Sequence, residues 1–171
     1  LQYLVAHRMS VRVIDFLEEI DVDHHRRQRT PVALGGVPER IRDLEERWVR
    51  RAIARWKDHP KIHILGDLDA ERIGIVSLVI DGGRLHHNLG ARLLSDRFGI
   101  QTRGGCMCAG SYGHELLGIS EARSFEIRCA LDQGAESEKP GWIRISFSPA
   151  TEEDEFELLL SAVEQLADHW Q

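Results

Sequence analysis

The chain has 171 residues, 42% of them hydrophobic and 29% charged, which is ordinary for one globular domain or slightly more. Its 28 acidic residues outnumber its 22 basic ones, and a formal charge of −6 disfavours a protein that wraps the phosphates of DNA or RNA. No run of about 18 apolar residues is present, so we expect no membrane span, and the N-terminus lacks the pattern of a secretory signal. Three cysteines, an odd and sparse set, favour a reducing, cytoplasmic setting over a disulfide scaffold.

The first 37 residues form the first of two predicted parts. Apolar residues at helical spacing predict a helix from Leu4 to Ile20. The polar stretch 21–36, interrupted by Pro31, predicts a connector. Its basic residues and histidines are compatible with anion binding, but a solvated loop is the favoured interpretation.

The second part, 38–171, begins with a helix and two strands. Pro38 is typical of a first helical turn, and the helix is predicted to end near Trp56. Its apolar stripe consists of Ile41, Leu44, Trp48, Ala52 and Trp56. Strands are predicted at 61–65 and 73–80, and the second is apolar on both faces, which predicts a central strand covered on both sides.

Helices and a glycine-rich loop follow. The spacing of leucines predicts a helix over 85–98. A short extended segment at 100–103 leads into a glycine-rich loop at 104–110. Helices are then predicted at 112–117 and, with Ser120 as the N-cap, as far as Leu131.

The chain is predicted to end with a strand and a long helix. Residues 142–147 alternate, so that Ile143, Ile145 and Phe147 face one way and Arg144 the other. A capping signal at 151–154 begins the last helix, whose stripe consists of Phe156, Leu159, Leu160, Val163 and Leu166. Strands interrupted by helices indicate an α+β fold, close to an α/β sandwich, in which helices pack on a small sheet.

The thiols of the glycine-rich loop are the first candidate for chemistry. Cys106 and Cys108 lie in it, and a guanidinium such as that of Arg103 would lower a thiol pKa and favour a reactive thiolate. From the spacing alone, two small, partly buried residues in a tight turn are the favoured interpretation. Metal binding by both thiols and His114 is a third interpretation, but three ligands with C-x-C spacing make an incomplete site.

Arg144 is the second candidate, because it interrupts a strand that is otherwise apolar on one face. Its planar fork of N–H donors suits a carboxylate, which it can bind through two hydrogen bonds. An arginine on the solvated face of an edge strand is the alternative interpretation, and position alone does not decide between them.

Other catalytic signatures are missing from the sequence. There is no G-x-G-x-x-G, P-loop, G-x-S-x-G or H-E-x-x-H motif. His86 and His87 are predicted to lie at the surface or partly packed at a helix start. The three lysines, Lys57, Lys61 and Lys139, lie in polar surroundings, so none is expected to act as an activated amine.

Two blocks of sequence resemble one enzyme family. The segment Phe98–Ala109 resembles the small-domain loop of class V aminotransferases, the branch that includes cysteine desulfurases and selenocysteine lyases. The segment Lys139–Phe147, followed by 151–154, resembles the last strand and closing helix of that family. The resemblance covers roughly 38–171, and the predicted N-terminal helix is similar to the family's last large-domain helix.

This resemblance implies a pyridoxal 5′-phosphate (PLP) enzyme of fold type I. Its small domain has a small mixed or antiparallel sheet with helices packed mainly on one face. The lysine that forms the Schiff base with PLP belongs to the large domain, which precedes the residues seen here. The chain would then be the C-terminal small domain of a longer homodimeric enzyme that acts on an amino acid, and it would be inactive alone.

The resemblance also implies roles for three residues. Arg144 matches the family's arginine for the substrate α-carboxylate, and Arg103 matches the loop arginine near the substrate. Cys108 matches the sulfur-accepting cysteine of the desulfurases. The two histidines that precede that cysteine in the family are here Cys106 and Met107, which favours general aminotransferase-like or lyase chemistry over desulfurase chemistry. A non-catalytic binding or assembly domain that reuses the fold is the alternative from another class.

Overall fold

The sheet is the centre of the fold in the computed structural model, which describes residues 37–105 and 110–171. Its four strands are β1 (Ile62–Ile64), β2 (Ile75–Ile80), β3 (Arg103–Gly105) and β4 (Trp142–Ser146), in the order β1-β2-β4-β3. Every neighbouring pair is antiparallel. The last strand of the chain is therefore inserted between the second and the third, which confirms the antiparallel form of the predicted sheet.

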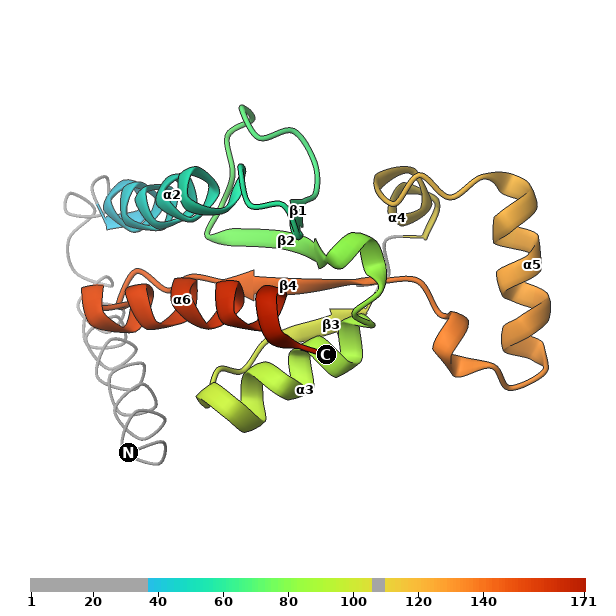
Figure 1. Cartoon of the computed structure of the whole chain (residues 1–171). Coiled ribbons are helices and arrows are strands. Elements are labelled where there is room, and N and C mark those ends of the chain that lie inside the picture. The colour runs from blue at the N-terminus through green and yellow to red at the C-terminus, as the bar shows by residue number, and fades with distance from the viewer. Residues whose placement is uncertain (1–36, 106–109) are drawn as a thin grey trace, which may run out of the picture.

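Three helices cover one face of this sheet, namely α2 (Val37–Trp56), α3 (His87–Phe98) and α6 (Glu153–His169) (Figure 1). They and the inward residues of the strands share one hydrophobic core. Its most deeply buried side chains include Trp56, Val76, Leu78, Leu94, Ile143, Ile145, Phe156 and Val163. The sheet and these three helices, called the body below, confirm the α+β class with helices mainly on one face.

The opposite face of the sheet is less covered than the sequence predicts. On β2 the inward residues Val76 and Leu78 are fully buried, whereas Ile75, Ser77 and Val79 between them are only partly buried. The prediction that this strand is covered on both sides is therefore wrong for the described part of the chain. β-Branched residues suit a pleated strand on either face, so their presence does not show that a second layer exists.

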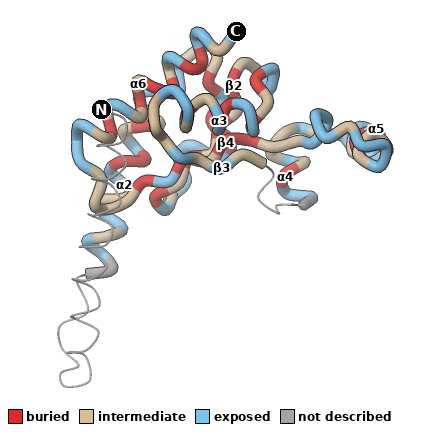
Figure 2. The backbone as a smooth tube through the Cα atoms, turned by 90° about the horizontal axis from the view of Figure 1, so that it is seen from below, coloured by how far each residue is buried: buried red, intermediate tan, exposed pale blue. Residues whose placement is uncertain are grey.

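The remaining helices form an arm, residues 110–138, that projects from the body (Figures 1 and 2). The arm comprises α4 (Gly110–Leu116), α5 (Glu121–Asp132) and the short 3₁₀ turn η2 (Glu136–Glu138). A second 3₁₀ turn, η1 (Asp81–Gly83), follows β2 in the body. Ile127 is the one buried residue of α5. The arm therefore adds little to the core.

Several sequence predictions lie outside the described residues. They are the helix from Leu4 to Ile20, the connector 21–36 and the domain boundary at residue 37. One prediction inside the described residues is wrong in part, because Gly104 and Gly105 belong to β3 and not to a loop. None of the described helices is long and apolar enough to cross a membrane.

Candidate functional site

Arg144 lies on β4, between β2 and β3, so it is on a central strand and the edge-strand interpretation is wrong. Its neighbours Ile143 and Ile145 are buried in the core, whereas Arg144 is partly exposed. Side chains alternate between the two faces of a strand, so Arg144 projects from the face that the helices leave open. The sequence predicted this orientation correctly.

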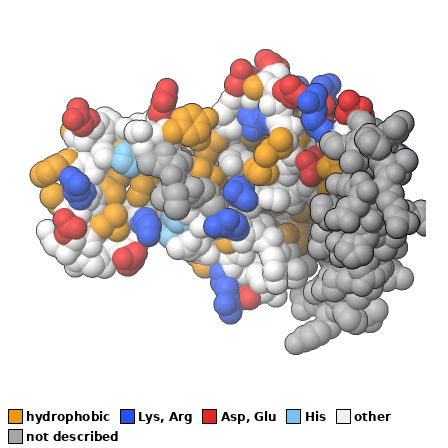
Figure 3. All heavy atoms as spheres, turned by 180° about the vertical axis from the view of Figure 1, so that it is seen from behind, with side chains coloured by type: hydrophobic (Ala, Val, Ile, Leu, Met, Phe, Trp, Pro, Cys, Tyr) orange, Lys and Arg blue, Asp and Glu red, His pale blue; other side chains and the backbone are white. Residues whose placement is uncertain are grey.

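Arg103 lies directly opposite Arg144 in the register of β3 and β4, and Ser77 of β2 lies opposite it on the other side. Residues directly opposite in an antiparallel pair share a face, and their Cβ atoms lie about 5 Å apart. The structure therefore brings together the two arginines predicted as candidate site residues. Seen from behind, this side of the molecule shows basic side chains among apolar ones (Figure 3).

Neither guanidinium of this pair has a carboxylate partner among the described residues. Nε of Arg144 is buried and has no hydrogen-bond acceptor there. Like charges directly opposite each other destabilise a sheet, and a buried N–H without an acceptor adds a further cost. An anion bound between Arg103 and Arg144 would relieve both, so the arrangement is suited to a carboxylate.

The first turn of α3 lies against β3 beside this pair. A Cβ atom on Gly104 would come within 2.8 Å of Oδ1 of Asn88 and 2.9 Å of the carbonyl oxygen of His87. Only glycine fits at such a contact. Gly104 of β3 therefore accommodates the close approach of the first turn of α3.

His87 is the one polar or ionisable side chain that is buried in the described structure, with 6% of its surface exposed. The expectation that it lies at the surface or partly packed is therefore wrong, whereas its neighbour His86, the N-cap of α3, is partly exposed as expected. Burial lowers the pKa of His87 to about 4, and the charges of His86 and Lys139 act in the same direction. Two adjacent histidines at a helix start gave no signal of which ring is buried.

The candidate thiols Cys106 and Cys108 lie outside the described residues, and so does the centre of the loop that contains them. Their predicted reactivity stays a prediction. Of the proposed metal ligands only His114, on α4, is described. Within the described ranges no three histidine, cysteine or acidic side chains are grouped as a metal site would require.

The lysines do not provide a site for PLP. Lys57 and Lys139 are exposed, and Nζ of Lys61 donates to the backbone oxygen of Asp168 at 3.2 Å. A lysine that forms a Schiff base needs a desolvated, activated amine. The lysines of this chain therefore do not fit the covalent attachment of PLP.

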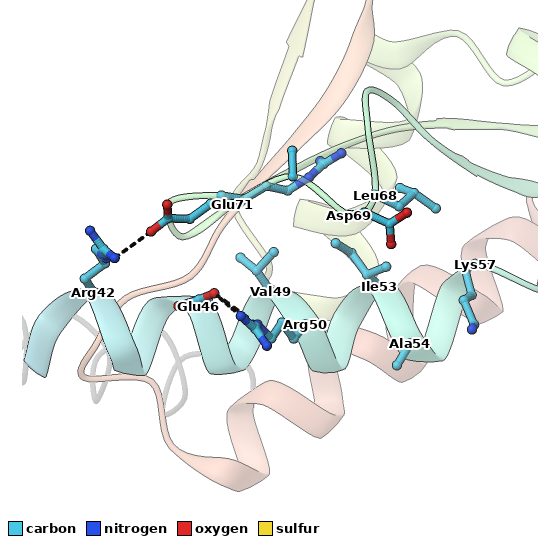
Figure 4. Close-up of a pocket in the computed structure, with 12 residues that line it drawn as sticks. Arg42, Glu46, Val49, Arg50, Ile53, Ala54, Lys57, Leu68, Asp69 and Glu71 are labelled. Carbon is cyan, nitrogen blue, oxygen red and sulfur yellow. Dashed lines mark hydrogen bonds and ion pairs between the residues drawn. The ribbon is translucent and has the colours of Figure 1, made fainter. Parts of the chain in front are cut away.

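A separate groove of about 840 Å³ lies between α2 and the segment 68–72 (Figure 4). Val49 and Ile53 line its floor, while ion pairs lie at its rim, one of them between Arg42 and Glu71 at 2.6 Å. No residue predicted for catalysis or substrate binding lines this groove.

Comparison with known proteins gives structural matches only, since no family model and no curated protein matches the sequence. The apo structure of a cysteine desulfurase from Thermococcus onnurineus NA1 matches with a TM-score of 0.55 and 24% identity, covering 76% of this chain and 26% of that one. The cysteine desulfurase CsdA from Escherichia coli matches with a TM-score of 0.47 and 16% identity over 74% of this chain and 25% of its own.

The chain thus spans about a quarter of the length of the solved cysteine desulfurases that it resembles. The first match, together with the antiparallel sheet and its one-sided helices, agrees with the small domain expected from the sequence. The described residues have the α+β fold of the small domain of a cysteine desulfurase.

Proposed function

We propose that this chain is the C-terminal small domain of a longer, PLP-dependent, class V aminotransferase-like enzyme that acts on an amino acid. Its part in that enzyme is to bind the substrate carboxylate and to close the active site. The single observation that supports this most is the opposition of Arg103 and Arg144, unpaired by any described carboxylate, on the open face of the sheet.

The arginines bind the substrate in the proposed site. Two parallel N–H donors of Arg144 bind the two carboxylate oxygens, and Arg103 adds a second positive charge from the neighbouring strand. A carboxylate fixed in this way leaves the α-carbon and the amino group directed away from the sheet. Because both arginines are on strands of a packed sheet, the carboxylate is held at a defined position relative to the rest of the enzyme.

PLP, when bound by the intact enzyme, supplies the electron sink for chemistry at the α-carbon. Since the lysines of this chain do not fit its attachment, the cofactor belongs to the large domain of the parent polypeptide. We expect that parent to be a cytoplasmic homodimer, as the sequence resemblance implies.

Cysteine desulfurase chemistry is the second candidate, because a solved structure that shares the fold is a cysteine desulfurase. Cys108 follows β3 closely in the sequence and matches the sulfur-accepting cysteine of that family. In this reaction L-cysteine and the Cys108 thiol give alanine and a persulfide on Cys108. The test is sulfide release from L-cysteine and dithiothreitol by the full-length parent, which Cys108→Ser abolishes if this assignment is correct and leaves unchanged if it is wrong.

The carboxylate site is tested with two ligands that differ in one group. The absorbance of PLP in the full-length parent reports the dissociation constants of L-alanine and of ethylamine, which lacks the carboxylate. Arg144→Gln should weaken L-alanine binding by about 10- to 100-fold, as expected for lost hydrogen bonds to a charged group, and leave ethylamine binding unchanged.

Arg92→Gln is the matched control, because Arg92 is an exposed residue of α3 whose guanidinium is paired with Asp96. It should change neither constant. Equal weakening of both ligands by Arg144→Gln would contradict the carboxylate role. A full-length parent without PLP absorbance would favour the non-catalytic binding or assembly domain instead.

A further inference from the structure

His87 lies where α3 meets the ends of β3 and β4. A Cβ atom on Gly141, just before β4, would lie 2.7 Å from Cε1 of His87 and 2.7 Å from the carbonyl carbon of Gly105. Gly105 pairs with Trp142 in the ladder between β3 and β4. The imidazole of His87 therefore fills space that Gly141 leaves open, against the backbone of both strands.

The neighbouring imidazole limits how His87 can move. The rings of His86 and His87 are in contact, with centroids 4.1 Å apart. Nδ1 of His86 accepts a hydrogen bond from the backbone N–H of Asn88 at 3.3 Å, so a neutral His86 has its proton on Nε2. That nitrogen is buried without a described partner. The His86 ring is thus fixed by α3 and supports one side of His87.

Residues in contact with His87 are close in sequence to both arginines. Gly104 and Gly105 directly follow Arg103 on β3, and Gly141 is three residues before Arg144. A displacement of the His87 ring would move these backbone segments, because a close-packed interior transmits changes in volume. The distance between the two guanidinium groups depends on the same segments.

We propose that His87 is a positioning residue, which in its uncharged form holds β3 and β4 so that Arg103 stays opposite Arg144. The inference rests on the proposed function, since it makes the geometry of the carboxylate site depend on protonation. The groups that act electrostatically on His87 are His86 from its own helix and Lys139 from the segment before β4. β3 contributes only glycine backbone at this contact, so no described carboxylate offsets an added proton.

Nuclear magnetic resonance of the 171-residue chain tests this without any ligand. The Cε1–H signal of His87 and the Nε–H signals of Arg103 and Arg144 are followed between pH 7.5 and about 3.5, a range chosen to bracket the lowered pKa. The expected result is one shared midpoint near the pKa of His87, at about 4. At that pH the arginine signals should have completed half of their change.

His87→Phe separates this effect from the titration of surface carboxylates, because it keeps a ring of similar size but adds no proton. The arginine signals should then lose most of their pH dependence, while the signal of Arg92, which is paired with Asp96, should titrate as in the unmodified chain. Arginine signals that titrate equally in His87→Phe would overturn the proposal. A His87 midpoint near 6.5 in the unmodified chain would also overturn it, and that measurement requires no variant to fold.

The outcomes also distinguish the two proposals. If the arginine signals follow His87 but Arg144→Gln does not discriminate between L-alanine and ethylamine, the positioning role stands and the carboxylate function fails. If discrimination is found and the arginine signals are independent of His87, the positioning role alone is overturned.

Discussion

At the scale of single residues, carboxylate binding depends on which face of β4 each side chain occupies. The alternation in 142–147 was enough to place Arg144 opposite the core, and the structure confirms it. That Arg103 lies beside it could not be predicted, since about 40 residues separate the two in the sequence and register across such a distance is set by the whole fold.

His87 shows the limit of local patterns more clearly. The helical spacing and the neighbouring residues predicted that His87 lies at the surface or is partly packed. In the structure, tertiary contacts with Gly104 and Gly141 bury it. The only sequence signal was indirect, in Gly104 and Gly141, which allow the close approach. A glycine in the sequence does not show which residue approaches it, so these glycines alone could not identify His87 as the buried ring.

Burial of His87 predicts a pH dependence of stability. Its pKa is about 4 in the folded chain, against 6.5 for an unperturbed histidine, so the unfolded chain takes up the proton first as the pH falls. The free energy of unfolding should therefore decrease between pH 6.5 and 4, by up to about 3 kcal/mol from this residue. Urea unfolding at pH 7 and pH 4.5 measures the decrease.

In His87→Phe the part of this decrease that belongs to His87 should vanish. His63, an exposed histidine on β1, provides the control, because His63→Phe should leave the decrease in place. An unchanged pH dependence in His87→Phe would show that the His87 ring is accessible to protons in the folded chain.

At the scale of secondary-structure elements, the sequence predicted most helices and strands well. Stripes of apolar residues located α2 and α6, and Gly99, in the left-handed conformation with φ 71°, ends α3. The capping signal before α6 is present as a reciprocal pair between Glu152 and Glu155. The prediction that β2 is covered on both faces was wrong, because the residue composition identifies a strand but does not show whether a second layer packs on it.

The N-cap of α5 gives a prediction for one element. The hydroxyl of Ser120 accepts a hydrogen bond from the backbone N–H of Arg123, at 3.3 Å. Ser120→Ala should destabilise α5 by about 1 kcal/mol, because it leaves a helical N–H without its acceptor. Amide hydrogen exchange in the first turn of α5 should then be about fivefold faster.

Ser124→Ala, in the interior of the same helix, is the control for this substitution, since alanine favours helix and should not accelerate exchange. Equal exchange rates in Ser120→Ala and the unmodified chain would show that the cap contributes nothing measurable. The effect should remain local, because α5 contributes only Ile127 to the buried residues.

At the scale of the whole molecule, the body contributes most of the stability of the fold and the arm contributes little. Phe156 of α6 is fully buried and packs against Trp48, with ring centroids 4.5 Å apart. Phe125 of the arm has 65% of its surface exposed. A phenylalanine therefore contributes to the hydrophobic core in the body but is largely solvent-exposed in the arm.

Matched substitutions of these two phenylalanines test the difference. Phe156→Ala should lower the free energy of unfolding by about 3 to 5 kcal/mol, as expected for an aromatic side chain removed from a core. Phe125→Ala should change it by less than about 0.5 kcal/mol. Chemical denaturation measures both, and a comparable loss for the two variants would contradict the division into body and arm.

The overall class followed from the order of predicted elements and the one-sided packing from the family resemblance, whereas the strand order was not predicted. β4 is last in the sequence but central in the sheet, and no local pattern records that it pairs with both β2 and β3. The projecting arm could likewise not be predicted from the sequence, because its helices have ordinary caps and spacing of apolar residues. These helices do not pack against the core, and this packing is determined only when the whole chain folds.

A crystal structure of the full-length parent with L-alanine bound would show directly where the substrate carboxylate lies. We expect the carboxylate oxygens to accept hydrogen bonds from the guanidinium of Arg144, with Arg103 on the adjacent strand. A carboxylate bound elsewhere, with Arg144 paired to an acidic residue of the large domain, would contradict it.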